Sequence, residues 1–302
     1  MIKCRLRTGF ITKLVSFITA SACVLSMTGC ALQMSKINDA QDLYSSGDNY
    51  RTVYEIFVYS FCDSNGDGVG DLQGIISKLD YIEDMGFDAI WLSPVCPSPT
   101  YHKYDVTDYK NIDPEYGTLA DYEALIESCH ARNIYVYNDM VMNHSSSEHP
   151  WFEEACDYLQ SLAPGEVPDA SECKYLNYYN FSDKESGGYS RVPGTDWFYE
   201  ARFWSGMPDF NLESEEVRQE FKDIAAFWLG EGCDGFRMDA VTSYYTNDTT
   251  SSTAALGRFA EDVREIDPDA YIVCEGWASQ TDYSKYYESG VDSMFDFAYA
   301  DS

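Results

Sequence analysis

The sequence is poor in basic residues: it holds 20 Lys and Arg against 51 Asp and Glu among 302 residues, and its formal net charge is −31. Binding to DNA or RNA requires a basic surface that neutralises phosphates, so this charge argues against any nucleic-acid partner. An acidic surface by itself indicates only solubility. The partner must therefore be sought among other classes of molecule.

The chain also lacks two common cofactor signatures. Outside the first 30 residues there are seven cysteines, an odd number, and none has the C-x-x-C spacing of a metal site. No G-x-G-x-x-G follows the first expected strand, which leaves a dinucleotide-binding fold without support. Cys156 and Cys173 share one loop-rich segment and could form a disulfide, whereas three others lie in helical or strand patterns typical of small buried side chains.

The N-terminal segment has the pattern of a targeting signal. Basic residues within the first 13 positions precede an apolar stretch, Leu14–Met27, that is too short to span a bilayer comfortably. The string Met-Thr-Gly-Cys30 then resembles a bacterial lipobox. We expect residues 1–29 to be a lipoprotein signal peptide, Cys30 to be lipidated, and residues 30–49 to be a polar tether. The protein would then be exported and held at the outer surface of the bacterial cytoplasmic membrane only through its lipid; an ordinary secretory signal or a short anchor helix remains an alternative.

From residue 50 onward, β-like and helical patterns alternate. The expected strands are Val53–Phe61, Ala89–Leu92, Ile134–Val141, Gly235–Met238, Tyr271–Cys274 and Val291–Phe297. The expected helices are Leu72–Met85, Leu119–Arg132, Glu215–Leu229, Ala254–Ile266 and Tyr283–Glu288. This alternation predicts an α/β fold with a parallel sheet, either doubly wound or a (β/α)₈ barrel. Residues 145–211 interrupt it with an irregular segment rich in Tyr, Ser and Gly.

Three of the expected strands end on carboxylates. The strings are Asp139-Met-Val-Met-Asn143-His144, Gly235-Phe-Arg237-Met-Asp239 and Val273-Cys-Glu275. An acid at the C-terminal end of a strand is how a (β/α)₈ barrel presents its catalytic groups. In this order the strings resemble the conserved strand-end regions of the α-amylase family of retaining α-glucan hydrolases.

The resemblance covers about residues 50–302 and implies a (β/α)₈ TIM barrel that stops after strand six. Residues 50–144 and 212–302 would form the barrel, and residues 145–211 would be the small B domain that the family inserts after strand three. The family's third carboxylate, in a Phe-x-x-x-His/Asn-Asp string after strand seven, is absent from the sequence. We therefore expect the chain to be the N-terminal part of a longer enzyme or the product of a truncated gene.

The resemblance assigns the two central catalytic roles. Asp239 would be the nucleophile that forms a covalent glycosyl-enzyme, and Glu275 the general acid and base, with carboxyls about 5–5.5 Å apart. Arg237 lies two residues before Asp239 on the same side of the strand, and we expect its guanidinium to lower the pKa of Asp239. The alternatives are a structural Arg–Asp pair at a strand end and a solvated loop glutamate.

The resemblance also implies a set of sugar-contacting residues. His144 would hydrogen-bond the sugar at the cleaved bond, Asp139 would support the active-site network, and Asn143 would help to order the nearby loop. Tyr104 and Asp105 follow the second strand and resemble a pair that stacks on and hydrogen-bonds the same sugar. A lone histidine is more often structural, but the D-x-V-x-N-H pattern favours a functional one.

The segment after the first strand has the pattern of a cation-binding loop. Oxygen-bearing groups at alternate positions can wrap one hard cation, and Gly68 allows the tight turn. A true EF-hand is excluded because its twelfth position would be Gly74 and a strand precedes the loop. A similar loop occurs in oligo-1,6-glucosidase-like members of the family, so we expect structural Ca²⁺; a solvated acidic turn is the alternative. The expected ligands are Asp63, Asn65, Asp67, Val69 and Asp71.

These features predict a glycoside hydrolase that cleaves α-1,4 bonds, with α-1,6 bonds as an alternative, in starch, glycogen or maltooligosaccharides. Ala240 after the expected nucleophile leans towards α-1,4 bonds, whereas Thr242-Ser243 stands where many α-amylases have Lys-His and leaves the acceptor side open. Two other hypotheses remain: a non-catalytic α-glucan-binding lipoprotein or inactive remnant, and a transglucosylase.

Overall fold

A computed structural model describes residues 51–300 of the chain. The expected signal peptide, the lipidated Cys30 and the tether lie outside the described residues. Between residues 51 and 300, no helix is both long enough and apolar enough to cross a membrane.

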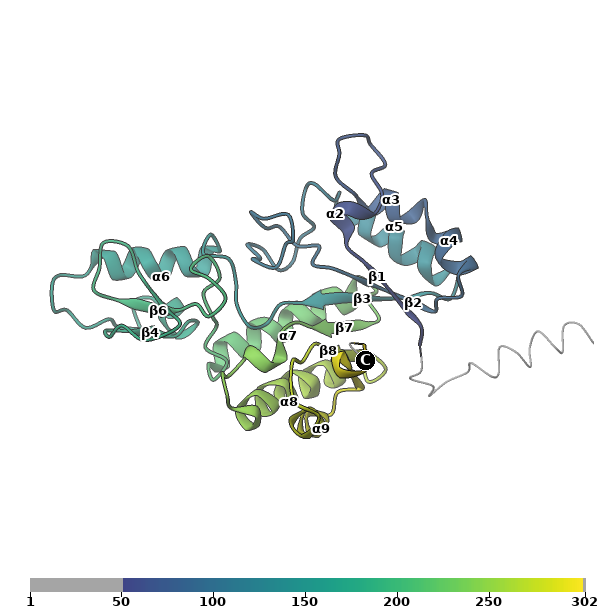
Figure 1. Cartoon of the computed structure of the whole chain (residues 1–302). Coiled ribbons are helices and arrows are strands. Elements are labelled where there is room, and N and C mark those ends of the chain that lie inside the picture. Colours follow the sequence, from purple (N-terminus) through teal and green to yellow (C-terminus); the bar gives the residue numbers. More distant parts are fainter. Residues whose placement is uncertain (1–50, 301–302) are drawn as a thin grey trace, which may run out of the picture. The chain divides into compact units, whose positions relative to one another are not determined.

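The central sheet has six strands, all parallel, in the order β1-β2-β3-β7-β8-β9. They are β1 (Val53–Ile56), β2 (Ala89–Leu92), β3 (Tyr135–Met140), β7 (Gly235–Met238), β8 (Tyr271–Cys274) and β9 (Ser293–Met294). Each strand pairs with the next central strand along the chain, without the reversal of order that defines a doubly wound sheet. The sheet is therefore an arc of a (β/α)₈ barrel, as the sequence predicts (Figure 1).

Helices lie between these strands and after the last of them. They are α2 (Val58–Phe61), α3 (Leu72–Ile76), α4 (Leu79–Asp84), α5 (Leu119–His130), α7 (Glu215–Gly230), α8 (Thr249–Ile266), α9 (Gln280–Tyr286) and α10 (Phe297–Ala300). Two short 3-10 helices, η2 (Val241–Ser243) and η3 (Tyr287–Ser289), follow β7 and α9. Side chains cap several of these helices; Thr118 and Asp121 form a capping box at the start of α5.

Several of the expected elements are wrong in extent; the last expected strand, Val291–Phe297, is reduced to Ser293–Met294, and α10 begins at Phe297. The first strand ends at Ile56, and α2 occupies the rest of the expected strand. The expected helix over residues 72–85 is two helices, because the chain tightens between α3 and α4. There the Ser77 hydroxyl donates to the Gly74 carbonyl at 2.7 Å and the Lys78 amide donates to the Ile75 carbonyl at 2.9 Å. Such short-range bonds replace the regular helical pattern.

The two faces of the sheet bury different side chains. On one face, residues such as Ile90, Val136 and Ile272 join the main hydrophobic core with the helices. On the other face, Trp91 and Tyr137 belong to a small separate cluster with Tyr271 and Phe295 packed against it. Successive side chains of a strand point to opposite faces. Polar residues that lie two positions before or after Trp91 or Tyr137 in a strand therefore lie on this second face.

The segment between β3 and α7 folds into its own small lobe (Figure 1). It contains α6 (Pro150–Ser161), the 3-10 helix η1 (Lys174–Asn177) and a three-stranded antiparallel sheet in the order β4-β6-β5, with β4 (Phe181–Ser182), β5 (Tyr189–Arg191) and β6 (Phe198–Glu200). Two isolated β-bridges fix the last part of this segment. His144, just after β3, pairs with Asp209, and Tyr179 of the lobe pairs with Phe210.

Gly235 is required where β7 begins. Its φ is +153°, and a Cβ atom there would lie 2.0 Å from the carbonyl oxygen of Tyr271 in β8. Only glycine allows this close approach of two backbones. In the same register of β7 with β8, Arg237 pairs with Val273, and on its other side it pairs with Asp139 of β3.

Candidate active site

One guanidinium holds three carboxylates together at the C-terminal ends of the central strands. Nη1 of Arg237 lies 2.9 Å from Oδ1 of Asp139 and 2.6 Å from Oδ1 of Asp239. Nη2 of Arg237 lies 3.1 Å from Oε2 of Glu275. Arg237 and Asp239 are buried, the side chain of Asp139 is fully covered, and Glu275 is partly buried. The structure thus brings together the carboxylates of all three sequence strings.

Sheet register explains why these acids converge. Asp139 is the direct partner of Arg237 in the pairing of β3 with β7. Asp239 and Glu275 each follow the last residue of a strand, and their amides continue the ladder by donating to Met140 and Met238 at 3.1 and 2.9 Å. Parallel strands end at the same edge of a sheet, so groups at these positions become neighbours.

Burial and charge set the protonation of the two aspartates. Burial raises the pKa of Asp239, the charge of Asp139 raises it further, and the Arg237 guanidinium opposes both. Burial also raises the pKa of Asp139, against Arg237 and the hydrogen bonds of Tyr104 and Trp91. Arg237 lowers the pKa of Asp239, as expected, but burial and the charges of Asp139 and Glu275 outweigh it, because one cation is shared among three acids in a desolvated site.

Removing the charge of Asp139 should shift the acidic limb of the pH profile of any activity that requires ionised Asp239. The negative charge of Asp139 disfavours the ionised form of Asp239. In Asp139→Asn the pKa of Asp239 should fall, so the residual activity should persist to lower pH than in the wild type. The measurement is the pH profile of kcat/KM.

The control for this shift is Glu265→Gln, which removes one acid on α8 that pairs with Lys222 at 2.5 Å. It should leave the acid limb in place. If the acidic limb of the pH profile were the same in Asp139→Asn as in the wild type, the charge of Asp139 would have no effect on the pKa of Asp239, although both carboxylates contact one guanidinium.

Aromatic side chains enclose the charged cluster. The Tyr104 hydroxyl and the Trp91 indole N–H donate to Oδ2 of Asp139 at 3.1 and 3.2 Å. The Arg237 guanidinium lies 4.7 Å from the Trp91 ring centroid, a cation–π distance. Beside the cluster is a pocket of about 510 Å³ on the face of the sheet that carries Trp91 and Arg237. Its lining includes Glu55, Trp91, Tyr104, Arg237, Glu275 and Phe295.

Three of these lining residues were not predicted from the sequence. Trp91 and Glu55 are direct register partners on β2 and β1, and Phe295 follows β9 and contacts the Trp91 ring at 5.3 Å. Burial raises the pKa of Glu55, Arg237 lowers it and Glu275 raises it. The period of two along each strand would have placed Glu55 and Trp91 on the face of Arg237, had the register been known.

Glu275 has two further hydrogen bonds that fix its carboxylate. Oε2 accepts from the Ala240 amide at 3.1 Å, and Oε1 accepts from the Trp277 indole at 3.2 Å. Ala240 is in the left-handed region, with φ +48°, which an alanine adopts only under constraint. Trp277 is exposed and stacks on Phe297, with ring centroids 3.9 Å apart. The carboxylate of Glu275 is thus oriented by backbone and indole donors.

His144 and Asp105 lie outside the direct contacts of Arg237. His144 is buried, and burial lowers its pKa to about 4, so its imidazole is neutral at pH 7. The exposed Phe203 ring lies 5.1 Å from it, between ring centroids. Asp105 is buried and accepts hydrogen bonds from the hydroxyls of Ser98, at 2.7 Å, and Thr100. Asp105 is thus bound by the loop that precedes it.

The end of β3 is joined to the inserted segment by a short polar chain. Asn143 Nδ2 donates to Asp209 Oδ1 at 3.0 Å, and Asp209 Oδ2 accepts from the Arg202 amide at 3.2 Å. Burial raises the pKa of Asp209 to about 7. The Phe210 amide also donates to the Asn143 carbonyl at 2.9 Å. These bonds hold the lobe beside His144.

The acidic loop after β1 is an array of short-range hydrogen bonds. Asp63 accepts the amides of Gly66 and Gly68 at 2.6 and 2.8 Å, and backbone donors, with Gly68 first, lower the pKa of Asp63. Asp71 is buried, caps α3 by accepting from the Gly74 amide at 2.6 Å, and binds Ser64. Within residues 51–300, no three His, Cys, Asp or Glu side chains gather as a metal-ligand group. The oxygen donors suit a hard cation in type, and calcium binding stays a prediction.

Two other features have structural roles. The seven cysteines in the described part of the chain are all free, so Cys156 and Cys173 form no disulfide.

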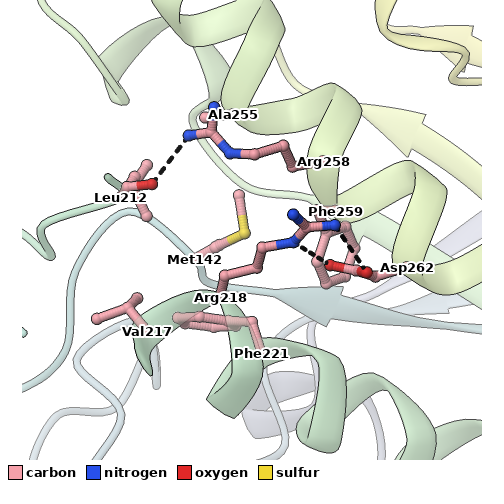
Figure 2. Close-up of a pocket in the computed structure, with 9 residues that line it drawn as sticks. All are labelled: Met142, Leu212, Val217, Arg218, Phe221, Ala255, Arg258, Phe259 and Asp262. Carbon is pink, nitrogen blue, oxygen red and sulfur yellow. Dashed lines mark hydrogen bonds and ion pairs between the residues drawn. The ribbon is translucent and has the colours of Figure 1, made fainter. Parts of the chain in front are cut away.

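Figure 2 shows a pocket between α7 and α8, of only about 20 Å³, which is room for about one water molecule. There Arg218 donates two hydrogen bonds to Asp262, at 2.8 and 3.0 Å, and ties the helices together.

Comparison with known proteins agrees with this architecture. Residues 55–302 match the family model of the alpha amylase catalytic domain. The chain belongs to the alpha-amylase family. It is 42% identical over 252 residues to alpha-amylase 3 of Dictyoglomus thermophilum, covering 82% of this chain and 47% of that protein. It is 40% identical over 203 residues to oligo-1,6-glucosidase of Parageobacillus thermoglucosidasius, covering 63% and 34%.

A solved structure of the family is similar as well. The structure of Eubacterium rectale Amy13B superposes with a TM-score of 0.80 at 55% identity, covering 83% of this chain and 48% of that one. The chain thus spans about half the length of that structure and less than half of the two curated relatives.

Proposed function

We propose that the protein is a retaining glycoside hydrolase that cleaves α-1,4-glucosidic bonds in starch, glycogen or maltooligosaccharides. The observation that carries the proposal is the single guanidinium of Arg237 shared by Asp239 and Glu275. One planar group bridging two carboxyls favours the short spacing, about 5–5.5 Å, of a retaining pair over the wider spacing of an inverting pair. Membership of the alpha-amylase family supports the same reaction class.

In this proposal Asp239 attacks the anomeric carbon and Glu275 protonates the leaving glycosidic oxygen. The first step breaks the glycosidic bond and forms a glycosyl ester on Asp239. Glu275 then removes a proton from water, the water oxygen attacks the same carbon, and the ester breaks to release a sugar with its configuration retained. Because Asp239 reacts as a carboxylate, its raised pKa means that activity should be lost as the pH falls through that pKa.

The remaining residues of the cluster would bind and orient the glucosyl ring. Arg237 and Asp139 would fix the position of Asp239, and the Tyr104 ring is at hand for stacking on the apolar face of a sugar. Neutral His144 can donate one hydrogen bond and accept another, which suits a sugar hydroxyl. Its Nε2 atom has no hydrogen-bond partner among the described residues, although it is buried. Asp105 would also bind the sugar, once the hydroxyl of Ser98 or Thr100 no longer donates a hydrogen bond to it.

Maltotetraose hydrolysis followed by proton NMR tests the proposal. We expect α-anomers as the first products, before mutarotation equilibrates them, and faster cleavage of maltotetraose than of isomaltose. β-anomers would exclude the retaining mechanism. Products longer than maltotetraose would point to transglucosylation, and binding without cleavage to a non-catalytic glucan-binding protein.

We also propose that the loop over residues 63–71 binds structural Ca²⁺ through Asp63, Asn65, Asp67, Asp71 and the Val69 carbonyl. The oxygen donors and the ionised Asp63 support this proposal. Chelation with EGTA should lower the melting temperature by about 5–10 °C, since a ligand at 100 times its Kd stabilises by about 2.7 kcal/mol. Asp63→Asn should abolish the response, while Asp80→Asn, which removes an exposed acid of α4, should keep it. If EGTA did not change the melting temperature of the wild type, the loop would be a solvated acidic turn without a bound cation.

A further inference from the structure

Lys103 has an unusual backbone conformation next to the candidate active site. It precedes Tyr104 directly, and its φ is +64°, in the left-handed region. Among residues 51–300 only four residues other than glycine have a positive φ, and two of them are asparagines, which tolerate this region. A long side chain such as lysine adopts it at a cost in free energy, so the surrounding contacts must hold it there.

A buried ion pair supplies that hold. The Lys103 side chain is 2% exposed, and Nζ lies 2.8 Å from Oδ2 of Asp113 and 2.5 Å from Oε2 of Glu115. The Tyr116 ring centroid is 5.4 Å from Nζ. Burial lowers the pKa of Lys103, but its hydrogen bonds to the two carboxylates outweigh burial and the net pKa is raised. Lys103 therefore stays charged inside the protein, which requires its partners to remain in place.

The same segment is tied down on both sides of Lys103. The Ser98 amide donates to Oδ2 of Asp113 at 3.2 Å, and the Ser98 hydroxyl donates to Asp105 at 2.7 Å. The Tyr104 amide donates to Nδ1 of His102 at 3.1 Å. Residues 98–105 thus form a closed loop whose anchor is the segment around Asp113.

The direction of Tyr104 depends on this loop. The Tyr104 hydroxyl reaches Oδ2 of Asp139 at 3.1 Å, and its ring centroid lies 5.8 Å from the Arg237 guanidinium carbon. Tyr104 follows the left-handed residue immediately, so a change of Lys103 to an ordinary backbone conformation would redirect the Tyr104 side chain away from β3. The contact between Tyr104 and Asp139 thus rests on the conformation of residue 103.

We propose that Lys103 is a positioning residue: its ion pairs with buried Asp113 and half-exposed Glu115 hold residue 103 in the left-handed conformation that presents Tyr104 to the catalytic carboxylates. This inference rests on the proposed function only for its activity readout. A merely structural ion pair would stabilise the loop without any specific link to Tyr104. The two roles are separable because glycine adopts the left-handed conformation without cost.

Four single variants and two double variants test the proposal. Lys103→Met removes the ion pair and leaves a side chain that resists a positive φ; Lys103→Gly removes the ion pair but not the conformation. Both should lower the melting temperature, because Asp113 loses its partner. Lys103→Met should reduce kcat/KM for maltotetraose by about 10–100-fold, since misplacement by about 1 Å is enough for such a loss. Lys103→Gly should stay within about threefold of the wild type.

The link to Tyr104 is tested by a double-mutant cycle. If Lys103 acts through the Tyr104 contact, Lys103→Met combined with Tyr104→Phe should be no worse than the poorer single variant, to within about twofold. The matched control is Arg218→Met, which disrupts the ion pair with Asp262 between α7 and α8. It should lower the melting temperature, keep kcat/KM within about twofold, and combine with Tyr104→Phe multiplicatively.

Crystal structures of the variants give a readout that does not depend on catalysis. In Lys103→Met the distance between the Tyr104 hydroxyl and Asp139 should exceed about 3.5 Å, and in Lys103→Gly it should stay in hydrogen-bond range. Equal activity losses in the Met and Gly variants, multiplicative losses with Tyr104→Phe, or an unchanged Tyr104 in Lys103→Met would each overturn the proposal. A wild type that hydrolyses no glucan would refute the proposed function alone, and the crystal structures would still decide the positioning role.

Discussion

Asp239→Asn should abolish turnover while leaving the fold intact. An amide cannot form the glycosyl ester, so kcat for maltotetraose should fall by about four to six orders of magnitude. Stability should change little or rise, because a buried carboxylate whose pKa is already raised by burial and by Asp139 is replaced by a neutral group of the same shape. The measurement combines single-turnover kinetics with thermal unfolding.

The control for this prediction is Asp262→Asn, which removes another buried acid, 23 residues further along the chain on α8. Burial raises the pKa of Asp262, but hydrogen bonds from Arg218 and Lys222 outweigh it and the net pKa is lowered. This variant should lose stability and keep its kcat. Turnover in Asp239→Asn within tenfold of the wild type would remove Asp239 from the role of nucleophile.

Arg237→Met should damage both stability and activity, and among the variants proposed here it should cost the most stability. It leaves Asp139, Asp239 and Glu275 close together without their common cation, and removing one partner of a buried ion pair costs about 3–5 kcal/mol. We also expect kcat/KM to fall at least about 1,000-fold, because the carboxylates will take up protons and move apart. Denaturant unfolding and steady-state kinetics measure the two effects.

The stability loss of Arg237→Met should depend on pH in a defined sense. Without the guanidinium the pKa values of Asp139 and Asp239 rise further above those of the unfolded chain, so the folded state binds more protons than the unfolded state. Stability should then fall as pH rises from the unfolded pKa, near 4, through the raised folded values. The deficit relative to the wild type should be larger at pH 7.5 than at pH 5.

Arg218→Met is again the matched control. Arg218 is partly exposed, and Lys222 still pairs with Asp262 at 3.2 Å, so the loss of stability should be smaller than in Arg237→Met. Its kcat/KM should stay near that of the wild type. A loss in Arg237→Met no greater than in Arg218→Met would show that the three acids do not depend on their shared guanidinium.

The sequence predicted the elements with strong periodic patterns. Ala89–Leu92, Gly235–Met238 and Tyr271–Cys274 are strands with the expected bounds, because each is a short apolar run between clear helix and turn signals. Elements with weak patterns were misplaced. The aromatic run after Ile56 favours a strand by composition, but it turns into α2 because the Gly70 amide of the returning loop bonds the Tyr59 carbonyl at 2.7 Å.

By itself the sequence determined which acids lie at strand ends, because a carboxylate after an apolar β-like run is visible in the residues. The strings that carry these acids resemble the alpha-amylase family, to which the chain belongs, and predicted Asp139, Asp239 and Glu275 as candidate site residues. Only the tertiary structure decided how these acids share Arg237, that burial outweighs the guanidinium at Asp239, and that Glu55 and Trp91 face the same pocket. The physical reason is that strand register and desolvation depend on residues far apart in the chain, whereas period and composition are local.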